Sequence, residues 1–292
     1  MENYKYDFAV VGGDLRQAYM AELLAEKNFS VILYETQQHP QCEGFPFAGS
    51  LMEAIKSAKT IIAPIPLTRE GKKIYAKNEQ SDLTVCELKN QLQKGQKLFA
   101  GCISEELCQW GIENQVDMYD FMENEELTLY NTIATAEGTI AEAIIRHPVN
   151  LHRSKSLVIG YGRCAKVLAQ GLHGLCSQVS VCARKPSARS EAQVAGHQAI
   201  SFLMLKEKIN EYDFIFNTVP SLVLDKSILS HVKPEGIIID IASAPGGVDY
   251  QAAEQLGIKA YLCLGLPGKY APKSSAEALV QVLLSNSEWN DK

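Results

Sequence analysis

Several features that would assign this chain to common functional classes are missing from its sequence. No apolar run approaches the roughly 20 residues that a membrane-spanning helix needs, and the first residues lack the pattern of a signal peptide. There is also no clustered run of Lys and Arg, and the net charge of −6 argues against a nucleic-acid partner. We therefore expect a cytoplasmic protein that binds neither a membrane nor nucleic acid.

Motifs for metal binding and for nucleophilic catalysis are absent as well. The eight cysteines form no CxxC pair, so we expect free thiols and no metal site. No GxSxG segment is present, and none of the six histidines stands in a setting typical of a catalytic triad. The sequence therefore identifies no catalytic residue, and the general base stays unknown.

What the sequence does contain is a pattern that occurs twice: an apolar strand, a glycine turn, a helix and a second strand. The first copy starts at 6–14 and reaches its second strand at 30–35, and the second copy starts at 156–162 and reaches its second strand at 178–184. This order of elements is typical of parallel sheets that are covered by helices on both faces. It predicts an α/β protein with two Rossmann-like domains and parallel sheets.

Further strands and helices are expected after each copy. The first half should add strands at 60–64 and 97–101 and helices at 51–57, 83–92 and 104–110. The second half should add strands at 212–217, 236–240 and 259–263 and helices at 227–231, 250–256 and 274–284. The alanine-rich segment 131–146, which Pro148 stops, predicts a linking helix.

These elements predict a domain division with a cleft between two α/β domains. We expect an N-terminal substrate or partner domain at 1–130, a linking helix at 131–147, a Rossmann domain at 151–270 and a C-terminal helix at 271–292. Ligands of such sheets bind beyond the carboxyl ends of the strands, so candidate site residues are sought there.

The segment GYGRCA at 160–165 matches the GxGxxG/A pattern of dinucleotide-binding turns. Gly160 permits the tight turn, Gly162 lets a pyrophosphate approach the backbone, and Ala165 lets the helix pack close to the strand. The N–H groups at the start of the helix then receive the phosphates. We predict cofactor contacts at Gly160, Gly162, Arg163 and Cys164. The alternative is a tight turn in a domain that binds no nucleotide.

Two basic residues, Arg184 and Lys185, follow the second strand of this unit. A domain that binds NAD usually has Asp or Glu there, which accepts hydrogen bonds from the ribose 2′-hydroxyl. Two cations suit a 2′-phosphate instead, and Arg also stacks on adenine. We therefore predict NADP as the cofactor, with ordinary solvated loop charges as the alternative.

Two later strand ends carry small residues and proline, which let a flat ring lie against the backbone. One is the segment NTVP at 217–220 and the other is DIASAPGG at 240–247. Simple loop chemistry is the alternative explanation for both. The predicted contacts to the nicotinamide half are Asn217, Thr218, Val219, Pro220 and Ala242.

The case for a substrate site is weaker. Gly13, Asp14 and Arg16 belong to a glycine turn at the start of a helix, which suits an anion, but this turn lacks GxGxxG. Arg16 can pair with a carboxylate, although a surface arginine explains it equally well. Thr135 and Glu137 lie in the linking helix and can face the cleft, although Glu137 can equally be a solvated charge. We predict these five residues as substrate-binding.

Taken in order, the segments GGDLR, TAEGTIAEAI, GYGRCA, CARK, NTVP, DIASAPGGVD and LPGKYAPKSSAE resemble the A subunit of bacterial dipicolinate synthase. The C-terminal half is also similar, more distantly, to shikimate and 2-hydroxyacid dehydrogenases. The resemblance implies an enzyme of spore-forming bacteria that oxidises dihydrodipicolinate to dipicolinate (pyridine-2,6-dicarboxylate) with NADP as acceptor. It also implies a partner, the B subunit of dipicolinate synthase.

Two other functions stay open. The chain can be an NADP-binding regulatory or non-catalytic subunit whose partner carries the chemistry, which the lack of an obvious catalytic His or Lys favours. It can also be a dehydrogenase that acts on another small carboxylic acid. The sequence does not give the oligomeric state, so a homo-oligomer stays open too.

Overall fold

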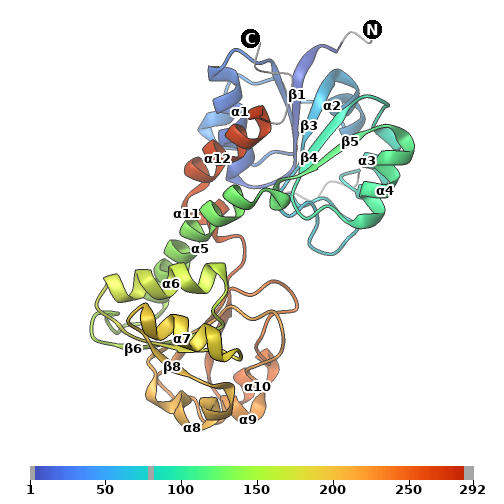
Figure 1. The fold of residues 1–292 in the computed structure, drawn as a ribbon. Helices are drawn as coiled ribbons and strands as arrows, with labels where there is room; N and C mark the ends of the chain where they lie inside the picture. The colour runs from blue at the N-terminus through green and yellow to red at the C-terminus, as the bar shows by residue number, and fades with distance from the viewer. Residues whose placement is uncertain (1–3, 78–81, 286–292) are drawn as a thin grey trace. The chain divides into compact units, whose positions relative to one another are not determined.

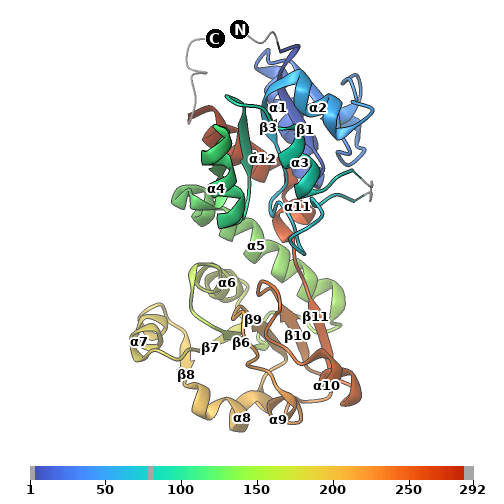
Figure 2. The same cartoon turned by 90° about the vertical axis from the view of Figure 1, so that its right-hand side faces the viewer.

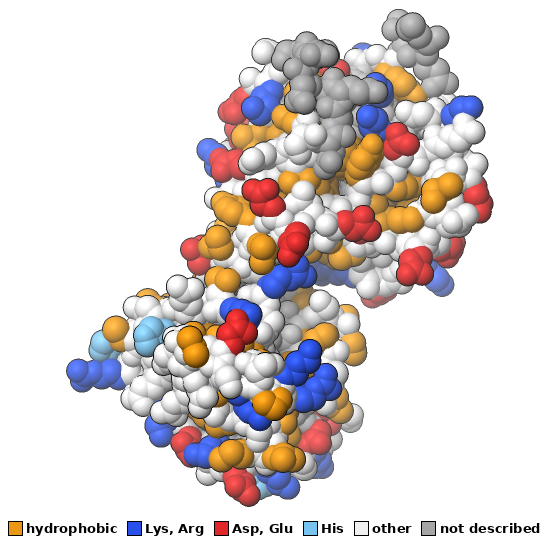
Figure 3. Space-filling model, in the orientation of Figure 1, with side chains coloured by type: hydrophobic (Ala, Val, Ile, Leu, Met, Phe, Trp, Pro, Cys, Tyr) orange, Lys and Arg blue, Asp and Glu red, His pale blue; other side chains and the backbone are white. Residues whose placement is uncertain are grey.

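The computed structural model describes residues 4–77 and 82–285, which form two compact units (Figure 1). Unit 1 consists of Met1–Tyr130 and Ala271–Lys292, and unit 2 consists of Asn131–Tyr270. Within the described ranges, no helix is both long and apolar enough to cross a membrane. On the face that Figure 3 shows, basic, acidic and hydrophobic side chains are interspersed on both units.

Unit 1 is built on a parallel sheet of five strands in the order β2-β1-β3-β4-β5. The strands are β1 (Tyr6–Val11), β2 (Val31–Tyr34), β3 (Ala58–Ile62), β4 (Lys97–Ala100) and β5 (Asp117–Asp120). The helices are α1 (Leu15–Glu26), α2 (Leu51–Ser57), α3 (Val85–Gln91), α4 (Glu105–Asn114) and α12 (Pro272–Ser285). Short 3-10 turns lie at Pro40–Cys42 and Phe121–Glu123.

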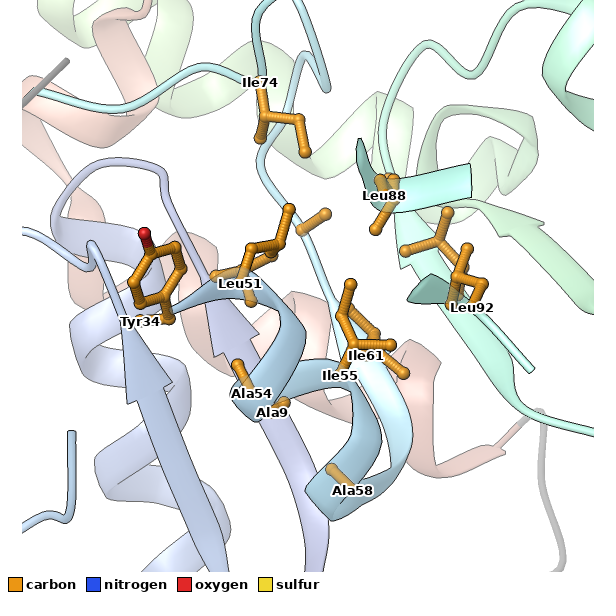
Figure 4. Close-up of a cluster of buried hydrophobic side chains, with 14 of the residues drawn as sticks. Ala9, Tyr34, Leu51, Ala54, Ile55, Ala58, Ile61, Ile74, Leu88 and Leu92 are labelled. Carbon is orange, nitrogen blue, oxygen red and sulfur yellow. The ribbon is translucent and has the colours of Figure 1, made fainter. Parts of the chain in front are cut away.

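Alternate residues of each strand in unit 1 serve two separate hydrophobic clusters, one on each face of the sheet. Ala9 and Ile61 face the cluster that α2, α3 and α4 cover, which Figure 4 shows. Phe8 and Ile62 face the other cluster, which α1 and α12 cover. Each such fully buried large side chain stabilises the fold by about 2 kcal/mol. Because α12 supplies part of this second cluster, the C-terminal helix belongs to unit 1.

Unit 2 contains a parallel sheet of six strands in the order β11-β10-β9-β6-β7-β8 (Figure 2). The strands are β6 (Lys155–Ile159), β7 (Gln178–Cys182), β8 (Gln198–Ile200), β9 (Phe214–Asn217), β10 (Ile237–Asp240) and β11 (Lys259–Leu262). After β8 the chain returns to the other side of β6, so the strand order reverses between β6 and β9. This is the order of the Rossmann fold, which binds dinucleotides at that reversal.

Helices cover both faces of the sheet in unit 2. They are α6 (Arg163–Gly174), α7 (Pro186–Val194), α8 (Leu205–Lys208), α9 (Lys226–Leu229), α10 (Tyr250–Gln255) and α11 (Leu266–Tyr270). Short 3-10 turns lie at Phe202–Met204 and Ile209–Glu211. The α5 segment from Asn131 and helix α6 pack on one face, and α8, α9 and α10 pack on the other. Together the two sheets confirm the α/β class with Rossmann-like parallel sheets.

The linking helix, α5 (Glu125–Arg146), begins six residues before the expected start at 131. Glu125 and Glu126 occupy its first turn, where the helix dipole favours negative charge. Leu127 is buried and anchors the same turn to unit 1. The acidic first turn and the buried Leu127 therefore favour a helix start before the alanine-rich part of the segment.

Among the strands and α-helices of the structure, β5, α7, β8, α8 and α11 have no counterpart among the expected elements. All four residues of β5 are at least partly exposed, and Ala192 is the buried residue of α7. β8 has three residues, one of which is buried. None of these segments has the apolar periodicity on which sequence patterns depend.

Candidate dinucleotide-binding site

The turn after β6 closes tightly because Gly160 adopts a backbone conformation with φ of +97°. Its N–H donates to the carbonyl of Cys182 at the end of β7, over 2.9 Å. A Cβ at this position would lie 2.3 Å from Thr218 Oγ1, which itself donates to the Ile159 carbonyl over 2.8 Å. The turn after β6 therefore packs directly against the side chains of the turn after β9, and a side chain at position 160 would clash with Thr218.

Helix α6 starts directly after this turn, and in the described part of the chain no side chain caps its N-terminus with a hydrogen bond. Gly162 is its N-cap, makes no side-chain capping bond and is exposed, and a Cβ built on it meets nothing within 4 Å. Ala165, at 1% exposure, packs in the hydrophobic core beneath. The first N–H groups of the helix and the positive end of its dipole thus face open space, which suits a pyrophosphate.

The first two residues of α6 are Arg163 and Cys164, and we assign no chemical step to either side chain. Arg163 is exposed at the first helical position, and Cys164 is half-buried at the second. Burial raises the pKa of the Cys164 thiol, which keeps it protonated and hence a weak nucleophile. Their contribution to a bound phosphate would come from the backbone N–H groups and the charge of Arg163.

The loop after β7 presents cations. Arg184 and Lys185 are both exposed, and within the described part of the chain neither forms an ion pair. Arg189, which sequence reasoning missed, turns back from α7 and donates through Nη1 to the carbonyls of Ala183 (2.9 Å) and Arg184 (2.8 Å). A third cation therefore fixes the backbone that carries Arg184. The available signal was its position one helical turn after Pro186.

Nearby acidic charge does not neutralise this loop. Glu191, on α7, is engaged by Lys166 of α6, whose Nζ lies 2.6 Å from Glu191 Oε1. The loop therefore keeps a positive character beside the β6 turn, because β7 is the neighbour of β6 in the sheet.

Asn217 ends β9 and is fully buried, with its side-chain amide used inside the protein. Nδ2 donates to Asp240 Oδ1 over 2.8 Å and to the Val219 carbonyl over 3.1 Å, and Oδ1 accepts from the Val219 N–H over 3.2 Å. Asn217 therefore shapes the turn, while Thr218 and Val219 are half-buried and Pro220 is exposed. Asn217 would therefore affect a bound ligand by holding the turn in shape and not by direct contact.

Asp240, at the end of β10, is the second buried group of this region, and sequence reasoning did not single it out. Its Oδ1 accepts from the Ala242 N–H over 3.0 Å, and its Oδ2 accepts from the Gly247 N–H and the Tyr250 hydroxyl, both over 2.9 Å. The structure thus brings Asn217, Asp240 and Ala242 together. A polar residue at the end of an apolar strand was the available signal.

The predicted substrate residues of unit 1 form an internal pair. Asp14 caps α1, and its carboxylate accepts from Arg16 Nε over 2.9 Å and from Arg16 Nη2 over 2.8 Å. Arg16 Nη2 also donates to the Ile65 carbonyl over 2.5 Å, and Arg16 is only 4% exposed. Gly13 precedes this pair with φ of +88°. Arg16 is therefore a buried, paired arginine and not the surface residue of the alternative interpretation.

The predicted substrate residues of α5, Thr135 and Glu137, lie in unit 2. Thr135 Oγ1 donates to the Asn131 carbonyl over 2.8 Å, a bond within its own helix. Glu137 is exposed, and no ion pair engages it in the part of the chain that the structure describes. Gly13, Asp14 and Arg16 lie in unit 1, so the five predicted residues are divided between the units.

Glu142, another carboxylate of α5, accepts hydrogen bonds from three side chains. Sequence reasoning missed this residue. Glu142 is 3% exposed and accepts from Lys269 Nζ (2.5 Å), Tyr270 Oη (2.8 Å) and Arg146 Nε (2.7 Å). Burial raises the pKa of Glu142, but these donors outweigh it and lower the pKa to about 2. Gly138 permits this contact, because a Cβ there would lie 2.9 Å from the Tyr270 ring.

In the described ranges, no group of three or more His, Cys, Asp or Glu side chains is placed to hold a metal ion. The arrangement at the carboxyl ends of β6, β7, β9 and β10 instead offers exposed backbone donors, cations and two shaped turns. It can bind an elongated anionic ligand with a flat ring.

Comparison with known proteins gives the following similarities. Residues 7–122 match the family model that describes the N-terminal domain of the dipicolinate synthase A subunit. The chain is 30% identical to the A subunit of dipicolinate synthase from Bacillus subtilis (strain 168) over 289 residues, which cover 94% of this chain and 93% of that relative.

Solved structures give a consistent picture. The structure of the dipicolinate synthase A subunit from Bacillus halodurans is 28% identical with a TM-score of 0.82, covering 97% of this chain and 98% of that one. The corresponding structure from Bacillus subtilis is also 28% identical, with a TM-score of 0.79 and coverages of 97% and 96%. A transhydrogenase from Sinorhizobium meliloti, 15% identical with a TM-score of 0.66 and coverages of 96% and 95%, shares the fold.

Proposed function

Since the chain belongs to the family of the dipicolinate synthase A subunit, we propose that it oxidises dihydrodipicolinate to dipicolinate with NADP as the acceptor. We further propose that it works in the cytoplasm with the B subunit of dipicolinate synthase, and that the product serves spore formation. The relatives' names support the product, and the geometry of unit 2 supports the cofactor class.

The observation that carries the cofactor proposal is the uncapped N-terminus of α6 beside the reversal of strand order. Gly162 leaves the first N–H groups of the helix uncovered, and Gly160 lets the turn after β9 approach. Backbone donors at a helix N-terminus bind a pyrophosphate without any side-chain charge. The residues present therefore fit a dinucleotide.

Arg184, Lys185 and the anchored Arg189 support NADP rather than NAD. In an NAD site the end of the strand corresponding to β7 needs an acceptor for the 2′-hydroxyl, whereas this loop offers donors and positive charge. Guanidinium groups bind a phosphate with charge-assisted hydrogen bonds. The expected preference for NADP follows from this difference.

The proposed reaction removes a hydride, which goes to the nicotinamide, and a proton, which goes to water or to a base, from a dihydropyridine ring that becomes aromatic. A bound oxidised nicotinamide supplies the hydride acceptor. The protein then has to align the ring with the acceptor, exclude water and hold two carboxylates. We assign substrate contact to the Gly13, Asp14 and Arg16 turn and to Thr135 and Glu137. In Arg16, Nη1 is the nitrogen that Asp14 and Ile65 leave available.

The proposal is tested by NADPH formation in a mixture of purified chain, NADP and enzymatically generated dihydrodipicolinate, with and without the B subunit. We expect NADPH and dipicolinate in equal amounts, and little activity with NAD. Full activity of the B subunit in the absence of this chain would favour the regulatory function. Activity with another small carboxylic acid, and none with dihydrodipicolinate, would favour a different dehydrogenase.

A further inference from the structure

Asp240 carries a buried negative charge that the proposed binding of phosphates and substrate does not use. The residue is 0% exposed, and each carboxylate oxygen accepts two hydrogen bonds. Oδ1 accepts from Asn217 Nδ2 and the Ala242 N–H, and Oδ2 accepts from the Gly247 N–H and the Tyr250 hydroxyl. All four groups act as donors, which is the pattern that an ionised carboxylate requires.

None of these four donors is a cation, so the charge of Asp240 is solvated but not cancelled. Throughout the described ranges, no Lys, Arg or His forms an ion pair with Asp240. Burial raises the pKa of Tyr250, and its bond to Asp240 raises it further, so the phenol keeps its proton and donates. Burying an unpaired ion costs free energy. An amide at this position would turn its NH2 group toward two of the four donors, so the carboxylate both holds the turns and carries the uncancelled charge.

The position of Asp240 in the sheet indicates what this charge can act on. β10 lies on the β9 side of the strand reversal, while Arg184 and Lys185 follow β7 on the other side. A dinucleotide that spans the reversal, with its 2′-phosphate at the β7 loop, places its nicotinamide over the ends of β9 and β10. The turns that Asp240 holds, at 217–220 and 241–247, would line that half of the ligand.

We propose that the buried carboxylate of Asp240 makes this site select the oxidised, positively charged nicotinamide over the reduced, neutral one. The inference rests on the proposed function, because it needs a nicotinamide coenzyme in unit 2. Because Asp240 itself is fully buried, water screens its charge less than that of a surface carboxylate, and the charge would act on a cationic ring bound against these turns. After hydride transfer the ring is neutral, this attraction ends, and release of the reduced coenzyme is favoured. Asp240 is thus a specificity-determining residue that need not touch the substrate.

The test is calorimetric binding of NADP⁺, NADPH and 2′,5′-ADP to the full chain and to Asp240→Asn, Asp213→Asn and Tyr250→Phe. Asp213 is the matched control, because it precedes β9 at the opposite, amino end of the sheet and pairs with Lys233. In Asp240→Asn the loss of two accepted hydrogen bonds should weaken both coenzymes, and the loss of the charge should weaken NADP⁺ about tenfold more than NADPH. Binding of 2′,5′-ADP, which lacks the nicotinamide half, should change by less than about threefold. Asp213→Asn and Tyr250→Phe should preserve the ratio of the NADP⁺ and NADPH dissociation constants.

The outcomes separate the inference from the function on which it rests. An equal loss of NADP⁺ and NADPH binding in Asp240→Asn, or no loss of either, would mean that Asp240 only shapes the turns. If the variant does not fold, the test is the affinity of the unmodified chain for the two coenzymes. It should bind NADP⁺ at least as tightly as NADPH, and tighter binding of NADPH would contradict the inference. If the unmodified chain binds neither coenzyme, the proposed function fails together with the inference.

Discussion

Glu142 and Lys269 are 127 positions apart in the sequence, yet Lys269 Nζ donates to Glu142 Oε1 over 2.5 Å. The bond joins α5 to α11, the two segments through which the chain enters and leaves unit 2. Tyr270 and Arg146 complete the set of donors. Glu142 thus bonds the two connecting segments to each other within unit 2.

Replacing Glu142 by Gln should lower the free energy of unfolding by about 3 kcal/mol at neutral pH, because a buried acceptor of three donors loses its charge. The folded pKa of about 2 lies below the ordinary value of 4.5. This contribution is therefore fully present above about 4.5 and is lost as pH falls toward 2. Urea unfolding at several pH values should show this loss in the unmodified chain and not in the variant. Glu137→Gln, an exposed control on the same helix, should change stability by less than about 0.5 kcal/mol.

Gly162→Ala should separate ligand binding from folding. A methyl group at Gly162 meets no neighbour, so thermal stability should stay within a few degrees of the original. The methyl group would occupy the approach of a pyrophosphate, so we expect NADP binding to weaken at least about tenfold. Gly160→Ala is the contrasting variant, because its Cβ would lie 2.3 Å from Thr218 Oγ1, and it should lose stability as well. Unchanged NADP affinity in Gly162→Ala would place the ligand elsewhere.

Arg184→Asp should remove the preference for NADP over NAD. We expect the unmodified chain to bind NADP at least about tenfold more tightly, from one or more charge-assisted contacts to the 2′-phosphate. The new carboxylate would repel that phosphate and accept from a 2′-hydroxyl, so NAD affinity should be kept. Lys259→Asp makes the same charge change at an exposed position that begins β11. A preference that survives in Arg184→Asp would exclude Arg184 from the 2′-phosphate contact.

Arg16→Met should destabilise unit 1 by about 3 kcal/mol, because it leaves the buried Asp14 carboxylate without its partner. The measurement is chemical unfolding followed by tryptophan fluorescence, since both tryptophans of the sequence belong to unit 1. Arg69→Met is the control. Arg69 is exposed and stacks on the Tyr75 ring at 4.0 Å, so its loss should cost less than about 1 kcal/mol. Equal effects of the two substitutions would show that the Asp14 pair contributes no special stability.

The parts of the fold that the sequence predicted are those with a local cause. The glycine turn at 160–165, the apolar run of β6 and the helix after it each depend on residues a few positions apart. β5 and α7 went unrecognised because they are short and largely exposed, so they lack a periodic apolar face. The place of α12 in unit 1 depends on its contact with α1, which no local pattern encodes.

The same distinction holds for the candidate site. The cofactor residues predicted from the pattern, such as Gly162 and Arg184, lie at the carboxyl ends of neighbouring strands, because parallel strands bring those ends together. Asp240 and Glu142 escaped notice, since their importance comes from donors that reach them through the fold. The sequence shows only the charge of Arg16, and its pairing with Asp14 becomes apparent in three dimensions.

Unit 1 is assembled from two segments that lie on either side of unit 2 in the sequence, which has a consequence for its biosynthesis. Ala276, Leu279 and Leu283 of α12 fill the side of the sheet on which α1 packs. During translation the residues of unit 1 that precede unit 2 therefore emerge with an apolar face uncovered, and it stays uncovered until α12 has been made. Unit 2 is continuous in the chain, so all its residues are available before α12 completes unit 1.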